Sequence, residues 1–82
     1  MRSIKDINNF RVGDRVGFKR RTTMSQLFAV NMRHLRLDDV GVIESINEYT
    51  NSYVVLFDRK IGDWILAYNL HKSCKILKKI KR

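Results

Sequence analysis

The 82-residue sequence is poor in the residues that mark several common classes of protein. It has one cysteine, Cys74, so it cannot form an internal disulfide, and we expect a reducing, cytoplasmic setting. No run approaches the ~20 apolar residues that a membrane span needs, and residues 1–10 have no apolar core like that of a signal peptide. Proline is absent, and the four glycines lie at or near the ends of candidate strands.

The same scarcity argues against catalysis and metal binding. A structural zinc site needs about four cysteine or histidine ligands, whereas the chain offers only Cys74, His34 and His71. There is no glycine-rich loop for a phosphate, and no nucleophile has an obvious base beside it. The adjacent Asp38 and Asp39 would point apart on a strand. We therefore expect no enzymatic activity, no metal and no cofactor.

Acidic residues are also few, because 17 lysines and arginines face 8 aspartates and glutamates, which gives a formal net charge of +9. The charge is uneven: residues 1–37 carry +7, residues 38–63 carry −4 and residues 64–82 carry +6. Self-repulsion at this level destabilises a compact chain unless a polyanion offsets it. Nucleic acid, DNA or RNA, is the commonest such partner, and we expect it rather than a membrane. An acidic protein remains the alternative.

What the sequence does contain is enough apolar residues, 44%, for one modest core in a single domain. Short segments alternate apolar and polar residues or are rich in β-branched residues, and polar or glycine-containing turns separate them. Val16 and Phe18, and likewise Tyr53, Val55 and Phe57, are expected to face the core. The predicted strands cover residues 14–19, 39–46, 52–57, 63–68 and 74–78, with turns at 47–51 and 58–63 and one short helical turn at 69–71.

Residues 22–36 follow a different pattern. Their apolar residues recur at helical spacing, and Ser25 stands where it could cap a helix. We expect a short amphipathic helix lying against the strands, with an extended loop as the competing interpretation. The apolar face consists of Met24, Leu27, Phe28, Met32 and Leu35.

The segments 10–16, 39–46 and 53–58 together resemble SH3-like barrels of the KOW and Tudor type. The closest matches are the V-G-D-x-V opening at 12–16 and the G-x-I-x-x-I pattern at 41–46. The resemblance covers roughly residues 10–78 and implies a mainly β, five-stranded SH3-like barrel, in which residues 67–70 form a 3₁₀ turn before the last strand. We expect residues 1–82 to form this single domain. Within it we expect an N-terminal extension at 1–9, an inserted helix or loop at 20–37 between strands one and two, and a basic tail at 79–82.

By the same resemblance, KOW-type domains bind RNA, DNA, ribosomes or RNA polymerase, and Tudor-type domains bind methylated side chains in an aromatic cage. The family includes small bacterial and phage regulators. A cage here would use Tyr49, Tyr53, Trp64 and Tyr68. The long insertion at 20–37 departs from the short first loop of KOW-type domains, so their RNA contacts cannot be transferred position by position.

Two runs of basic residues are the candidate phosphate contacts, because each cation near a phosphate releases condensed counterions. They comprise Lys19, Arg20, Arg21, Arg33 and Arg36 in the first run, and Lys72, Lys75, Lys78 and Lys79 in the second. Possible base-stacking residues are Trp64, Tyr68 and Tyr49, although Trp64 is more simply a core or rim residue.

These patterns predict a non-catalytic nucleic-acid-binding protein with mainly electrostatic phosphate contacts. Because few aromatic residues are expected to be exposed, double-stranded DNA is slightly preferred over RNA. The alternative is a protein-interaction module or small regulator that docks on polymerase, ribosome or another acidic partner, using the inserted helix and the face that carries Val54 and Leu56. The sequence leaves the oligomeric state open.

Overall fold

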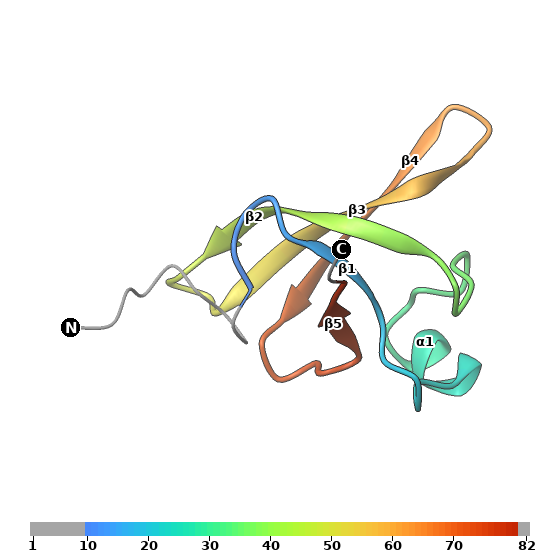
Figure 1. Ribbon diagram of the computed structural model, residues 1–82, viewed down its shortest axis with the longest axis horizontal. Helices are drawn as coiled ribbons and strands as arrows, with labels where there is room; N and C mark the ends of the chain where they lie inside the picture. The colour runs from blue at the N-terminus through green and yellow to red at the C-terminus, as the bar shows by residue number, and fades with distance from the viewer. Residues whose placement is uncertain (1–9, 81–82) are drawn as a thin grey trace.

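The computed structural model describes residues 10–80, and they form an antiparallel sheet with one short helix (Figure 1). The expected extension at 1–9 and the last two tail residues, 81 and 82, lie outside the described range. The elements are β1 (Arg15–Phe18), α1 (Met24–Ala29), β2 (Val40–Asn47), β3 (Ser52–Ile61), β4 (Trp64–His71) and β5 (Leu77–Lys79). No described helix is long and apolar enough to cross a membrane.

The strand order is β4-β3-β2-β1-β5, and every neighbouring pair is antiparallel. Four strands therefore follow one another as a meander, and β5 returns to lie beside β1. The mainly β class, the five strands and the helix between β1 and β2 are as predicted. The predicted closure into a barrel is not seen: β4 and β5 are the two edges of an open sheet, and no ladder joins them in the described residues.

Burial alternates along the strands as the sequence pattern indicates. Val16 and Phe18 are buried on β1, and Tyr53, Val55 and Phe57 are buried on β3. Ser52, Val54 and Leu56, which alternate with them on β3 and point to the opposite face, are half-buried. The core-facing prediction for these five residues is confirmed, because a strand places alternate side chains on opposite faces.

Helix α1 is much shorter than the apolar spacing over 22–36 predicts. Thr23, not Ser25, is the N-cap, and it forms a capping box with Gln26. The helix ends in a Schellman motif, in which Asn31 has a φ of 62° and the Met32 N–H donates to the Leu27 carbonyl at 2.8 Å. Met32 and Leu35 are still buried, but they reach the core from turns and not from a continued helix.

The β3–β4 hairpin is longer than predicted at both ends. β3 continues to Ile61 where a loop over 58–63 was expected, so only Gly62 and Asp63 form the turn. β4 continues to His71, so the short helical turn predicted at 69–71, and the 3₁₀ turn implied at 67–70, are wrong. These residues remain extended because they pair with the beginning of β3, down to Ser52 opposite His71.

Candidate nucleic-acid interface

The pairing of β1 with β5 brings the two basic runs together. Phe18 lies opposite Leu77 and Gly17 opposite Lys78, and the Lys19 N–H donates to the Ile76 carbonyl at 2.8 Å. The buried Thr22 hydroxyl donates to the same carbonyl at 3.3 Å and so fixes the turn that carries Arg20 and Arg21. The backbones of the two runs are thus side by side, although they are far apart in sequence.

We define the cationic surface as the exposed side chains on these adjoining segments. None of its members forms an ion pair with an acid in the described part of the chain. Their charge is therefore available to an anionic ligand. The cationic surface consists of Lys19, Arg20, Arg21, Lys75 and Lys78.

The structure places the other predicted cations elsewhere. Lys79 lies in β5, where the basic tail was expected to begin, and its ammonium is 3.5 Å from the Asp14 carboxylate. Lys72 lies near the β2–β3 turn, because its N–H donates to the Asn51 carbonyl. Arg33 is exposed and, with Phe28, lines a shallow cleft of about 400 Å³ beside α1.

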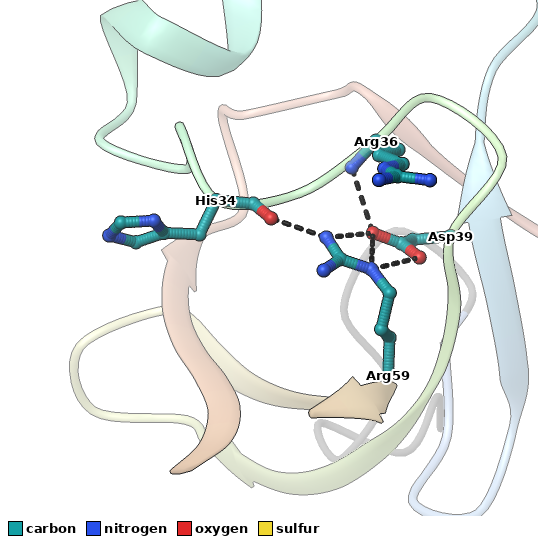
Figure 2. A network of polar contacts seen from close by, with 4 residues as sticks. All are labelled: His34, Arg36, Asp39 and Arg59. Carbon is teal, nitrogen blue, oxygen red and sulfur yellow. Dashed lines mark hydrogen bonds and ion pairs between the residues drawn. The ribbon is translucent and has the colours of Figure 1, made fainter. Parts of the chain in front are cut away.

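Arg36 borders a polar network that fastens the inserted segment to β3 (Figure 2). The Arg59 guanidinium donates to Asp39 from Nε, at 3.1 Å to Oδ1, and from Nη2, at 3.0 Å to Oδ2. Nη2 also donates to the His34 carbonyl, and the Arg36 N–H donates to Asp39 Oδ2 at 2.8 Å. The charge of Arg59 is therefore paired with Asp39 within the protein, and Arg59 is not part of the cationic surface.

Electrostatics within this network favour the ionised carboxylate. Burial raises the pKa of Asp39, but the hydrogen bonds from Arg59 and the Arg36 N–H, together with both positive charges, outweigh it, so the pKa lies below its usual value. On the outer face of the sheet Arg15 and Asp58 form a second, bidentate pair, with Nη1–Oδ1 at 3.0 Å and Nη2–Oδ2 at 2.5 Å. Hydrogen bonds from Arg15 lower the pKa of Asp58 despite partial desolvation.

The three candidate stacking residues have different surroundings. Trp64 is 77% exposed, so it is not a core residue. Tyr49 is 97% exposed in the β2–β3 turn, at the opposite end of β3 from Trp64. Tyr68 is half-buried and packs edge-on against Phe57, with ring centroids 5.9 Å apart.

An aromatic cage is not formed. Tyr53 is 1% exposed, its ring packs edge-on against Phe10, and its hydroxyl donates to the Cys74 carbonyl at 3.4 Å. Burial raises the pKa of Tyr53 to about 12. Since Tyr49 and Trp64 lie at opposite ends of β3, these rings cannot surround one methylated side chain.

Sequence reasoning missed the residues around Trp64. Because 58–63 was interpreted as a loop, Lys60 and Ile61 were not recognised as strand residues. Ile65 lies in a strand as predicted, but its exposure was not foreseen. Ile61 is 39% exposed and Ile65 58% exposed. The signal that was available is the Gly62–Asp63 dipeptide, which favours a two-residue hairpin turn between flanking apolar residues.

A second, uncharged concavity lies on the outer face of β2, β3 and β4. It is a shallow cleft of about 480 Å³, and its lining contains none of the predicted cations. The lining residues are Ser45, Asn47, Thr50, Ser52, Val54, Asn69 and His71. In the described range no group of three or more histidine, cysteine, aspartate or glutamate side chains could hold a metal ion.

Comparison of the chain with protein-family models, with curated proteins and with solved structures finds no match.

Proposed function

We propose that the protein is a non-catalytic nucleic-acid-binding domain that holds phosphates on the cationic surface. The observation that carries the proposal is the β1–β5 register, which sets Lys19, Arg20 and Arg21 beside Lys75 and Lys78. Each cation that neutralises a phosphate releases counterions, so affinity comes mainly from charge and depends steeply on salt.

The distribution of acids supports this proposal. Three of the described aspartates are engaged by cations outside the cationic surface: Asp39 by Arg59, Asp58 by Arg15 and Asp14 by Lys79. These three aspartates therefore neutralise cations elsewhere in the fold and leave the charge of the cationic surface uncompensated. Phosphate contacts of this kind fix position and carry little sequence information, so we expect weak sequence preference.

We also propose that the domain is related to the SH3-like barrels that its sequence resembles. The meander of β1 to β4, with β5 returning beside β1, supports this relation, since such a return is the step by which a twisted sheet begins to curl on itself. The bulge at Glu44, where the β2–β3 register shifts between Ile43 and Ser45, adds local bending.

The test compares two double variants of equal net charge. In Arg20→Gln/Arg21→Gln two members of the cationic surface are neutralised, and in the control Arg33→Gln/Arg36→Gln two exposed arginines outside the cationic surface are neutralised. Fluorescence anisotropy with labelled DNA and RNA oligonucleotides is measured from 50 to 300 mM KCl. The first variant should reduce the slope of log affinity against log salt by about 2, because two phosphate contacts are lost. Equal effects of the two variants, or no binding at 50 mM salt, would contradict the proposal.

The alternative function, docking on an acidic protein such as polymerase or the ribosome, is favoured by one observation. Helix α1 leaves Met24 38% and Phe28 57% exposed beside Arg33. A partner that this protein retains from lysate after nuclease treatment and at high salt, and that Phe28→Ala releases, would favour this alternative.

A further inference from the structure

The end of the β3–β4 hairpin, residues 60–65, is here called the hairpin tip. It projects away from the rest of the sheet at the upper right of Figure 1. Gly62 has a φ of 59° while Asp63 has a negative φ, the arrangement of a type II′ turn with glycine first. Ile61 lies directly opposite Trp64, so their side chains share one face, and Lys60 lies opposite Ile65. The hairpin tip therefore presents an indole ring supported by an isoleucine.

Side-chain contacts of Arg59 hold the base of the hairpin where the β3–β4 ladder is interrupted. The ladder is interrupted between the Leu56–Ala67 and Lys60–Ile65 pairs, so residues 57–59 of β3 face only Leu66 of β4. Arg59, within this interruption, is fixed by Asp39 and by the His34 carbonyl (Figure 2). The hairpin tip is therefore presented from an anchored base, and a ligand that contacts Trp64 need not order the whole hairpin first.

The hairpin tip lies at the same end of the sheet as part of the cationic surface. The registers align the end of β1 with the start of β2, and the start of β2 with the far part of β3. In Figure 1, α1 and the hairpin tip both lie toward the right, and the β2–β3 turn lies at the left. Three interstrand spacings separate β4 from β1, which is about 15 Å across the sheet.

We propose that Trp64 stacks on an unpaired base of the same nucleic acid whose phosphates bind the cationic surface; this inference rests on the proposed function. An exposed ring accepts any base, because every base has a π-face, and a paired base inside a duplex is already covered by its neighbours. The protein should therefore favour single-stranded or unpaired segments over a perfect duplex. The expectation of duplex DNA assumed that few aromatic residues were exposed, and Trp64 removes that assumption.

The chemistry of the hairpin tip favours a base over a lipid surface as the occupant. Asp63 adjoins the ring, and a carboxylate accepts hydrogen bonds from exocyclic amino groups such as N4 of cytosine. A membrane interface would instead require the carboxylate of Asp63 to lose water without a partner. Lys60, opposite Ile65, points to the other face of the hairpin, so the phosphates are left to the cationic surface and the hairpin tip contributes the ring and the carboxylate.

Trp64 is the single tryptophan of the chain, so intrinsic fluorescence reports on this position alone. The full chain is titrated with an unlabelled single-stranded oligonucleotide and with the perfect duplex of the same sequence. We expect the single strand to quench the emission and the duplex to quench it much less. Anisotropy with labelled versions of both should show that Trp64→Ala weakens single-strand binding about tenfold or more and leaves duplex affinity within about twofold.

Two further variants sharpen the test. Trp64→Phe should recover most of the single-strand affinity, because a smaller ring still stacks. Tyr49→Ala, which removes a still more exposed ring at the opposite end of β3, should leave single-strand and duplex binding unchanged.

Oligonucleotide binding without quenching, with Trp64→Ala equal to wild type, would overturn this inference and leave the proposed function standing. Failure of both oligonucleotides to bind at 50 mM salt would remove the proposed function as well. A blue shift of Trp64 emission with vesicles of phosphatidylserine and phosphatidylcholine, together with no quenching by oligonucleotides, would assign the hairpin tip to a lipid surface and overturn the inference.

Discussion

At the scale of single residues, two glycines in the sheet differ in what surrounds them. A Cβ built on Gly41 would lie 2.6 Å from the Leu56 carbonyl oxygen, a backbone atom held in the β2–β3 ladder. A Cβ on Gly17 would lie 3.0 Å from Cδ1 of Ile80, the end of a flexible and 37% exposed side chain. Only the first position therefore excludes every side chain.

We predict that Gly41→Ala lowers the free energy of unfolding by about 1–3 kcal/mol, because the strands must separate locally to admit the methyl group. Gly17→Ala, where Ile80 can turn aside, should cost less. Urea denaturation followed by circular dichroism measures both variants. If Gly41→Ala lowered the free energy of unfolding no more than Gly17→Ala does, β2 and β3 would be shown to separate at Gly41 at little cost.

A second residue-scale prediction concerns acid. Asp39 and Asp58 have pKa values below their usual range in the folded protein, so both stabilise it above the unfolded pKa of about 4 and cease to do so as pH falls through their lower folded values. Stability should therefore change little from these groups between pH 5 and 7 and should decline below about pH 4.

The control for this prediction is Asp39→Asn, which removes one of the two carboxylates. At pH 6 it should be less stable than wild type by about 1–2 kcal/mol, since Arg59 loses a charged acceptor. Thermal melts at pH 6 and pH 3 should show the difference shrinking at the lower pH. A constant difference at both pH values would mean that Asp39 acts through packing and not through its charge.

At the scale of elements, α1 depends on one buried side chain. Leu27 is fully buried in the core, whereas its neighbour Phe28 is 57% exposed. We predict that Leu27→Ala lowers the free energy of unfolding by about 2–4 kcal/mol and that Phe28→Ala changes it by about 0.5 kcal/mol or less. Urea titration of both variants measures the difference. Similar losses would indicate that the helix packs by a different face.

Sequence patterns predicted some of the elements correctly and others only in part. Alternation identified β2 and the first half of β3, because one face of each is buried. The helix was predicted too long, since Met32 and Leu35 keep helical spacing although Asn31 has already ended the helix. The Gly62–Asp63 dipeptide could have predicted the turn, but the exposure of Trp64 and Ile61 depends on packing, because buried strand residues are of the same types.

At the scale of the whole molecule, the cationic surface could be proposed but not located from sequence. The composition gives a formal net charge of +9, and the two basic runs can be recognised in the sequence. Their juxtaposition depends on Phe18 pairing with Leu77, a contact between distant segments that no local pattern specifies. Lys72, held near Asn51, and Lys79, beside Asp14, lie apart from Lys75, although all three belong to one run in the sequence.

The uncompensated charge leads to a prediction for the free protein. Repulsion among like charges at +9 should be relieved by screening, so the melting temperature should rise between 20 and 300 mM KCl. Differential scanning fluorimetry measures it, with equal osmolarity of sucrose as the control for excluded-volume effects. A melting temperature that falls with KCl would indicate that the Arg15–Asp58 and Arg59–Asp39 pairs outweigh the repulsion.

The place of β5 also has a consequence for biosynthesis. Strands β1 to β4 follow one another in sequence and can associate as they leave the ribosome. The second neighbour of β1, strand β5, is translated after the other described strands. Until that partner emerges, β1 is an open edge and the first basic run lacks its neighbour. The side-by-side arrangement of the two basic runs, on which the proposed function depends, therefore forms only after β5 has paired with β1.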